Sequence, residues 1–510
     1  MGRSVKVGAV ISGISVLMNV VYGLVIVPLM LRTRGAAEFG LYNMCTSILL
    51  SLLVLQAGFV STYMRYAVQL EEKGETTKRD ELNGLFLTVF VALAVIMAAV
   101  GVAIALNTEF VLGVGATAAE IALTKKLMLV LSALVALNTL NGMFLGIFTA
   151  RERFVFVKSI ALFDILVRTA LLFPVLYFGG DAVDVVLVWL GVVTVELVCY
   201  VVKNVSLGVK FRFSNFDWRL LREILGFTFF ILLKTMVDVL IWRIGSVLVT
   251  RYRGAEHNAV FGIGLSFYAM YQQLGLLLSG FLIPAINRLT ASKKENAAEM
   301  QTELMLKVGR LQFFICSFVI TAFAFFGRAF IADYAGEGYE GSYVISLLMM
   351  ISMLLPFCMQ LAEQTAVSKN LHRKMTVGYT LFAVATLAIS IPLTKLYGEI
   401  GAAVGLSIGV VASYNIYQIV YSHKVVGMNM KSWGRSLLSC LPSFVIPCIV
   451  GALIMLFGGI NKIAAFIPFA VLYTAVYWAS VWFIGMKDYE RNLFLVPAKR
   501  ILAKITRKQN

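Results

Sequence analysis

Long apolar runs separated by short polar segments make up almost the whole chain. A window of about twenty residues, the length of helix that crosses a bilayer, marks fourteen candidate membrane spans. The first seven cover residues 7–31, 41–67, 83–107, 122–149, 155–178, 183–203 and 223–249. The others cover 258–287, 305–332, 342–367, 375–395, 400–422, 436–457 and 463–485. The pattern predicts an all-α polytopic membrane protein with no soluble domain.

The composition agrees with this prediction, since 60% of the residues are hydrophobic and only 14% are charged. The first run is longer than the apolar part of a signal peptide and lacks a small-residue cleavage site, so we expect a retained helix. The six cysteines all lie in apolar runs and the three histidines are isolated. We therefore expect no metal site.

The positive charges predict the orientation. If the loops are assigned alternately to the two membrane faces, the face that includes the amino terminus holds 31 of the 44 lysines and arginines. The opposite face holds 9, and four lie within spans. Because cytoplasmic loops are enriched in these residues, we expect both termini in the cytoplasm. The net charge of +17 then reflects topology, and no nucleic-acid partner is needed to explain it.

An internal repeat recurs at an offset of 219 residues. RTRGA (32–36) ends the first span, and RYRGA (251–255) ends the seventh. The same offset maps 162–163 (Leu-Phe) onto 381–382 and Gly179 onto Gly398. Six spans lie in each copy, and an even number keeps the orientation, so we predict two parallel, pseudo-symmetric six-helix lobes followed by two extra helices. The expected domains are an amino-terminal lobe (1–208), a cytoplasmic interfacial linker (209–222), a carboxyl-terminal lobe (223–425) and the last two helices with a basic tail (426–510).

Two stretches resemble a known family. VIVPLMLRTRGAAEFGLYNMCTSILL (25–50) and LQAGFVSTYMRYAVQLEEKG (55–74) are similar to bacterial polysaccharide transporters, the Wzx-type oligosaccharide flippases. Their superfamily (multidrug/oligosaccharidyl-lipid/polysaccharide exporters) also contains multidrug and toxin extruders and the lipid II flippase. Fourteen spans suit the polysaccharide transporters and the lipid II flippase better than the drug extruders, which usually have twelve. The arginine- and asparagine-bearing run typical of the lipid II flippase is missing here.

The resemblance implies a flippase of the bacterial cytoplasmic membrane. It would move undecaprenyl-pyrophosphate-linked oligosaccharide from the inner to the outer leaflet by alternating access. Its partners would be this lipid-linked substrate, membrane lipids, a polysaccharide polymerase and other assembly proteins. Family members often carry an aspartate late in the seventh span, where this chain has Gly245.

Seven charged residues within the predicted spans are candidates for a site: the cations Arg65, Arg168, Lys234 and Arg243, and the anions Asp164, Glu196 and Asp238. The pairs Asp164/Arg168 and Lys234/Asp238 are four residues apart, so each pair shares a helix face and its members can neutralise one another. One interpretation is that these ions only help to pack the bundle. The other is that they face a central cavity, where intramembrane ionisable residues usually point. There Arg168 and Lys234, both near the midplane, would bind the substrate's pyrophosphate.

The remaining charges have weaker assignments. Arg65 lies near the inner end of span two, either as a positive-inside anchor or as the first contact for the phosphate. Asp164, Asp238 and Glu196 would be supporting charges in the cavity, and Glu196 would serve in proton or cation coupling or in a structural hydrogen bond. Arg243 is nine residues from Lys234, so it points the opposite way on a straight helix and is the weakest candidate.

Two other functions stay open. A multidrug extruder with cation coupling should prefer an acidic cavity, whereas cations here exceed anions by one, which discriminates weakly. A membrane polysaccharide polymerase or ligase needs catalytic groups on a sizeable external loop. The longest predicted one, 107–121, has two glutamates and no His, Lys or Arg, so we do not expect an enzyme.

No cofactor is expected. The chain has no P-loop, so it cannot drive transport with ATP by itself. An inside-negative membrane potential pushes a substrate with two negative charges outward by about 4–5 kcal/mol per 100 mV. Proton or sodium coupling is therefore not obligatory, and it stays open.

Overall fold

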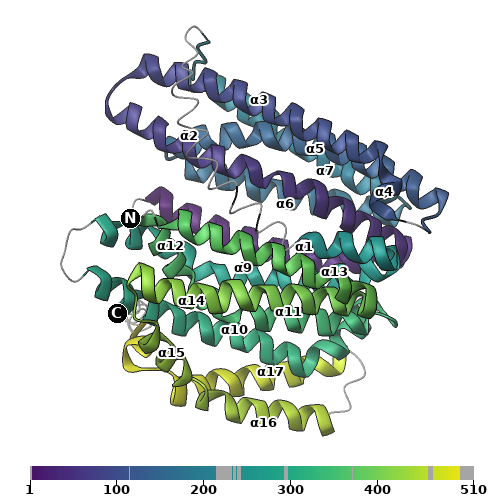
Figure 1. The fold of residues 1–510 in the computed structure, drawn as a ribbon, viewed down its shortest axis with the longest axis vertical. Coiled ribbons are helices and arrows are strands. Elements are labelled where there is room, and N and C mark those ends of the chain that lie inside the picture. The colour runs from purple at the N-terminus through teal and green to yellow at the C-terminus, as the bar shows by residue number, and fades with distance from the viewer. Residues whose placement is uncertain are drawn as a thin grey trace, which may run out of the picture. The chain divides into compact units, whose positions relative to one another are not determined.

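The computed structural model describes residues 3–113, 115–213, 233, 237, 243–291, 297–369, 371–457, 463–493 and 495. Every regular element in these ranges is a helix (Figure 1). Within them, nine helical segments are long and apolar enough to cross a membrane, or ten if the bent pair Met430–Leu438 and Pro442–Phe457 counts as one span. The predicted class, an all-α multi-pass membrane protein, is confirmed.

Two of these segments cover two predicted spans each. Gly13–Glu72 has 60 residues and Arg373–Val426 has 54, about twice what one crossing needs. Within the first, helix α1 (Arg3–Leu52) is broken at Gly35, with φ 83°. Within the second, helix α13 (His372–Val410) is broken at Gly398, with φ 64°. The seventh predicted span lies largely outside the described residues, so the total of fourteen stays a prediction.

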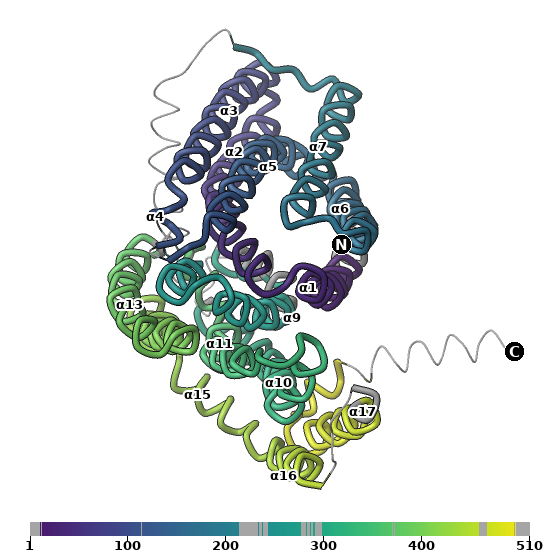
Figure 2. The backbone as a smooth tube through the Cα atoms, turned by 90° about the vertical axis from the view of Figure 1, so that its right-hand side faces the viewer, coloured from purple at the N-terminus to yellow at the C-terminus, as the bar shows by residue number. Residues whose placement is uncertain are grey.

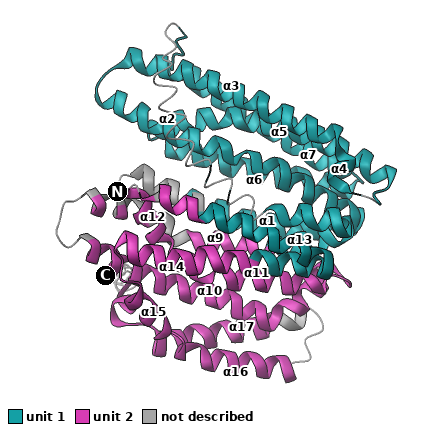
Figure 3. Cartoon of the chain, in the orientation of Figure 1, with its two compact units in different colours: residues 1–266, 379–406 teal, residues 267–378, 407–510 magenta. Residues whose placement is uncertain are grey.

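The chain divides into two compact units (Figure 3). The first comprises residues 1–266 and 379–406. Besides α1 it contains α2 (Val54–Glu72), α3 (Thr76–Leu106), α4 (Thr108–Leu112), α5 (Ala118–Ala150), α6 (Phe154–Tyr177) and α7 (Ala182–Ser206), with the start of α9 (Ala255–Ala291) and the middle of α13. Helix α5 packs against α1, α2, α3 and α7, and α1 packs along α6. In Figure 2, α2, α3 and α5 lie side by side, and α6 and α7 form another neighbouring pair.

An aromatic cluster closes one end of this bundle. Phe148 of α5 stacks on Tyr200 of α7 at 5.7 Å between ring centroids and meets Phe156 of α6 edge-on at 5.0 Å. The chain after α7 also belongs to this end, because Val209 is buried in the same cluster and the backbone N–H of Arg212 donates to the carbonyl oxygen of Asp80 at 2.9 Å. The first residues of the predicted linker are therefore tied to the start of α3.

The repeat at offset 219 appears in the backbone. Gly35 and Gly254, the glycines of the two RxRGA motifs, have φ of 83° and 96°. Gly179 and Gly398, which the same offset relates, have φ of 93° and 64°. A side chain is strained in this left-handed region, so glycine is the residue that permits each turn.

The arginines of the two motifs repeat as well. A Cβ atom added to Gly179 would lie 3.4 Å from Nη2 of Arg34, and one added to Gly398 would lie 3.6 Å from Nε of Arg253. Arg253 also donates a 2.8 Å hydrogen bond to the carbonyl oxygen of Lys395. In both copies the second arginine of the motif thus lies beside the turn between the fifth and sixth spans of that copy; among the described residues, only Arg253 forms a hydrogen bond with the turn region.

The second unit comprises residues 267–378 and 407–510. It contains the rest of α9 and α13, then α10 (Ala297–Ala335), α11 (Glu340–Cys358), α12 (Gln360–Ser368), η1 (Val411–Tyr417), α14 (Gln418–Tyr421), η2 (Ser422–Val426), α15 (Met430–Leu438), α16 (Pro442–Phe457), α17 (Ile463–Ser480) and η3 (Val481–Gly485), where η marks π-helix. Helix α10 packs against α11, α15, α16 and α17. The two extra helices predicted at the carboxyl end are α16 and α17; the predicted domain limits stay a prediction.

Candidate functional site

Arg168 occupies an aromatic sandwich inside the first unit. Its guanidinium carbon lies 5.0 Å from the ring centroid of Tyr22 on α1 and 4.7 Å from that of Trp189 on α7. Its Nη2 lies 3.2 Å from Oδ2 of Asp164, so the ion pair predicted from the four-residue spacing is present. The side chains of Arg168 and Asp164 are only 12% and 21% exposed. Cation–π attraction strengthens when the cation is removed from water, so the two rings hold the buried guanidinium of Arg168 in a defined orientation.

The position of Arg168 along α6 is central. It lies 14 residues after Phe154 and nine before Tyr177, the two ends of the helix. At 1.5 Å per residue it is about 21 Å from one end and about 14 Å from the other. A charge at that depth in a membrane-spanning helix needs a local reason.

Glu196 belongs to the same group. Asn141 on α5 donates its side-chain N–H to the carbonyl oxygen of Val193 at 3.2 Å and to Oε2 of Glu196 at 3.4 Å. Glu196 is also close enough to Asp164 and Arg168 for both charges to act on it. Four helices, α1, α5, α6 and α7, contribute to this group. We call its members the mid-bundle cluster: Tyr22, Asn141, Asp164, Arg168, Trp189 and Glu196.

The mid-bundle cluster has hydrogen-bonding capacity to spare. Nε of Arg168, Oδ1 of Asp164 and Oδ1 of Asn141 are buried and have no hydrogen-bond partner among the described residues. A buried polar atom without a partner costs about 1–3 kcal/mol, so such atoms normally bind water, an ion or a ligand. The cluster therefore offers one charged donor and two acceptors at mid-depth of the bundle.

The other predicted site residues do not join this cluster within the described ranges. Arg65 is exposed on α2, and Arg243 is exposed on the helical segment that leads to Gly254. Lys234 and Asp238 lie outside the described residues. The structure thus brings together Asp164, Arg168 and Glu196, and the binding roles assigned to all seven charges stay predictions.

Gly245, where the family resemblance led us to compare an aspartate, is closely surrounded by two apolar side chains. A Cβ atom at this position would lie 2.6 Å from the Phe261 ring and 2.8 Å from Leu406. A side chain at position 245 therefore requires the side chains of Phe261 and Leu406 to move.

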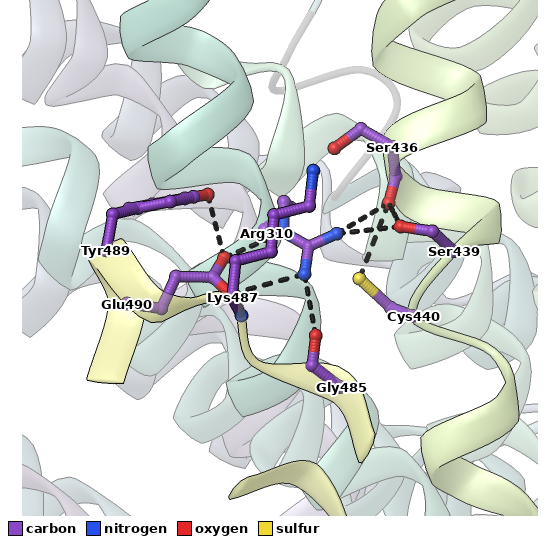
Figure 4. A network of polar contacts seen from close by, with 8 residues as sticks. All are labelled: Arg310, Ser436, Ser439, Cys440, Gly485, Lys487, Tyr489 and Glu490. Carbon is purple, nitrogen blue, oxygen red and sulfur yellow. Dashed lines mark hydrogen bonds and ion pairs between the residues drawn. The ribbon is translucent and has the colours of Figure 1, made fainter. Parts of the chain in front are cut away.

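The sequence analysis missed a buried ion pair in the second unit (Figure 4). Arg310 of α10 donates from Nε to Glu490 at 2.7 Å and from Nη2 to the same carboxylate at 3.2 Å. Its other bonds go to the carbonyl oxygen of Gly485 (2.7 Å), the carbonyl oxygen of Ser436 (3.0 Å) and the hydroxyl of Ser439 (2.8 Å). The two charged side chains are 2% and 0% exposed.

All five N–H donors of a guanidinium are accounted for by these bonds, so Arg310 has none left for a ligand. It joins α10 to α15 and to the segment after η3, and we assign it a structural role. The sequence did not predict this pair. Arg310 and Glu490 are 180 residues apart, and Arg310 counts only among the positive charges at the cytoplasmic ends of spans.

Comparisons with known proteins agree with this architecture. A family model described as polysaccharide biosynthesis protein matches residues 5–290. Among solved structures, the lipid II flippase MurJ in an inward closed conformation superposes with a TM-score of 0.69 at 13% identity, over 92% of this chain and 99% of that one. An inward-facing multidrug resistance MATE transporter of the MOP superfamily gives 0.63 at 14% identity, over 84% and 99%.

A third structure is similar to a lesser degree. The Vibrio cholerae MATE transporter VcmN in its bent form gives a TM-score of 0.57 at 13% identity, over 85% of this chain and 99% of that one. At such identities the likeness shows a shared fold. No curated protein gives a significant sequence match.

Proposed function

Because the chain belongs to the polysaccharide biosynthesis protein family, we propose that it is a flippase for undecaprenyl-pyrophosphate-linked oligosaccharide. It moves this substrate from the inner to the outer leaflet of the bacterial cytoplasmic membrane by alternating access, with both termini in the cytoplasm. The fold shared with a lipid flippase and with multidrug transporters supports transport. A polysaccharide polymerase and other assembly proteins then use the flipped product.

The observation that carries this proposal is the preorganised Arg168. Its guanidinium is held between Tyr22 and Trp189, at mid-depth of the bundle, with a buried Nε that has no partner among the described residues. Arginine binds phosphate oxygens through parallel N–H donors, which a pyrophosphate can accept. We propose that Lys234 supplies a second positive charge from span seven and that Arg65 meets the phosphate first, at the inner leaflet.

The carboxylates of Asp164 and Glu196 have a role in the empty state. While no substrate is bound, they balance the positive charge of Arg168, because an unpaired buried cation is energetically costly. An incoming pyrophosphate competes with Asp164 for the guanidinium and is repelled by both carboxylates. Uptake of a proton by one of them removes part of that repulsion, so proton coupling is compatible with the site, although the membrane potential alone drives the substrate outward.

The test is to inactivate the gene in its own host and examine the lipids by mass spectrometry. We expect accumulation of polyprenyl-pyrophosphate oligosaccharide, reversed by the wild type and by Lys158→Gln, which removes an exposed charge from the same helix. Arg168→Gln protein present in the membrane at the same level should not reverse it. A normal lipid pool with altered drug sensitivity would instead identify an extruder and reject the proposal.

A further inference from the structure

A cavity of about 730 Å³ opens at the end of the bundle where α5 turns into α6. Its walls come from the ends of α2, α5 and α7 and the starts of α3 and α6. The charged residues of its lining are Glu71, Glu72, Arg79, Arg151, Glu152 and Arg153. The positive-charge rule predicts that this end faces the cytoplasm.

The arginines of this cavity form few direct ion pairs, although three carboxylates also line it. Arg79 reaches Glu71 only at 3.5 Å, and its Nε is buried without a hydrogen-bond partner. Burial, together with the nearby positive charge of Arg79, lowers the pKa of the Arg151 guanidinium. In the part of the chain that the structure describes, no ion pair forms on Arg151 or on Arg153. The charge of Arg79 acts on Arg151, and two guanidinium groups that face one cavity can bind an anion together.

The turn that carries Arg151 and Arg153 has a strained backbone. Glu152 between them has φ 55°, and no other non-glycine residue in the described ranges has positive φ. Helices that end this way usually have glycine at the position. The turn is closed by hydrogen bonds from the N–H of Arg153 to the carbonyl oxygen of Phe148 (2.9 Å) and from that of Glu152 to Thr149 (3.0 Å). Strain of this kind concentrates at functional sites, where neighbouring structure enforces it.

The cavity is also preformed. Three of its lining residues, Met64, Ala150 and Leu207, pack against the core cluster that contains Phe148 and Tyr200, and close-packed rings of this kind resist rearrangement. The volume falls in the range of sites for small polar ligands, about 300–1,000 Å³. Its mixed lining offers guanidinium donors for phosphate and carboxylate acceptors, such as Glu71 and Glu152, for sugar hydroxyls.

We propose that this cavity binds the phosphorylated saccharide head group of the substrate on the cytoplasmic side, before the head group reaches the mid-bundle cluster. The inference rests on the proposed function for the identity of the substrate. The chemistry that it requires is a phosphate group with neighbouring hydroxyls. The phosphate of an anionic bilayer lipid is the other source of that chemistry.

Inorganic pyrophosphate is the probe that isolates the cavity. The full-length protein is purified in detergent as Arg168→Gln, which removes the proposed mid-bundle phosphate site, and binding is followed by calorimetry. We expect one pyrophosphate per chain, with the dissociation constant raised tenfold or more by a further Arg151→Gln and unchanged by Lys158→Gln, whose exposed lysine lies near the cavity but does not line it. Equal binding in the two double variants would overturn the proposal, whatever the result of the lipid assay.

A second variant keeps the test valid if Arg151→Gln fails to fold. Glu152→Gly retains all three arginines and removes the strain, so the protein should fold at least as well as the wild type. Glu152→Gln loses the same carboxylate but keeps the strained turn, so it is the reference variant. Because only glycine loosens the turn, we expect pyrophosphate to bind Glu152→Gly about threefold or more weakly than Glu152→Gln. Equal binding of these two variants would show that the strained turn does not shape the site.

A transport measurement distinguishes the two possible ligands of the cavity, the substrate and an anionic bilayer lipid. In a flipping assay, Arg151→Gln should raise the substrate concentration for half-maximal rate at least tenfold while the maximal rate changes less than twofold. Suppose that phosphatidylglycerol vesicles compete with pyrophosphate and that Arg151→Gln leaves the half-maximal substrate concentration unchanged. The cavity then binds a bilayer lipid, and the substrate assignment is wrong. If Arg151→Gln weakens pyrophosphate binding but the host lipid pool is normal, the proposed function fails while the anion site remains.

Discussion

Replacing Arg310 by methionine removes one partner of the buried ion pair and keeps an apolar chain of similar length. The change leaves Glu490 as a buried carboxylate with two of its four hydrogen bonds, from the backbone N–H of Lys487 (2.7 Å) and the hydroxyl of Tyr489 (2.9 Å). It also removes the donor from the carbonyl oxygens of Ser436 and Gly485. Breaking a buried pair from one side costs about 3–5 kcal/mol. Because Glu490 keeps two donors, we expect the lower end, about 3 kcal/mol.

The loss should be local to the segment that Arg310 holds. Hydrogen exchange of the full-length protein in detergent, read by mass spectrometry over residues 481–491, reports the opening of this segment. About 3 kcal/mol corresponds to exchange about a hundredfold faster. The matched control is Glu303→Gln, also on α10, which breaks the exposed pair of Glu303 with Lys307 and leaves the Lys307 contact with the Tyr489 ring in place. Exposed pairs contribute about 0–1 kcal/mol, so the control should change exchange less than about fivefold.

A double variant separates charge from packing. In Arg310→Met combined with Glu490→Leu, no buried charge remains, and apolar replacement of a whole buried pair is often close to neutral. We therefore expect the double variant to recover at least half of the lost protection. Equal exchange in Arg310→Met and Glu303→Gln, or a double variant worse than the single one, would refute the assignment of Arg310 as a structural anchor.

Three further predictions concern the first unit. Gly35→Ala should lower the free energy of unfolding by about 1–2 kcal/mol because φ there is 83°, whereas Gly13→Ala, inside the helix with no atom near an added Cβ, should be neutral or stabilising in the same thermal melts. Asp181→Ala should cost about 1 kcal/mol by removing the carboxylate that caps α7, and Asp181→Asn should restore most of it; equal melting of both variants would argue against the cap. Trp189→Leu should leave the protein level in the membrane unchanged but slow flipping several-fold by freeing one face of Arg168, and an unchanged rate would remove the sandwich from the mechanism.

The local features of this fold could be predicted from the sequence. The bilayer requires long apolar helices, so hydropathy alone marks the spans. The offset of 219 residues related Gly35 to Gly254, at the ends of the first and seventh spans, and the structure gives both glycines positive φ. The ion pair of Asp164 with Arg168 followed from helical spacing, since residues four apart share a face.

Contacts between distant parts of the chain could not be predicted. Asn141 and Glu196 are 55 residues apart, and no pattern in either helix pairs them. The sandwich on Arg168 needs rings from α1 and α7, whose facing sides depend on how the helices rotate in the bundle. The positive φ of Glu152 could not be predicted either, because such turns usually contain glycine and a glutamate does not indicate one.

The central claim is tested most directly by reconstitution. The purified protein is placed in liposomes whose inner and outer leaflets contain a fluorescent polyprenyl-pyrophosphate oligosaccharide, and a membrane-impermeant reductant quenches the label that it can reach. Without flipping about half of the fluorescence survives. We predict nearly complete quenching with the wild type and with Lys158→Gln, and survival of about half with Arg168→Gln. Survival of about half with the wild type, in liposomes where the protein is folded, would contradict the account.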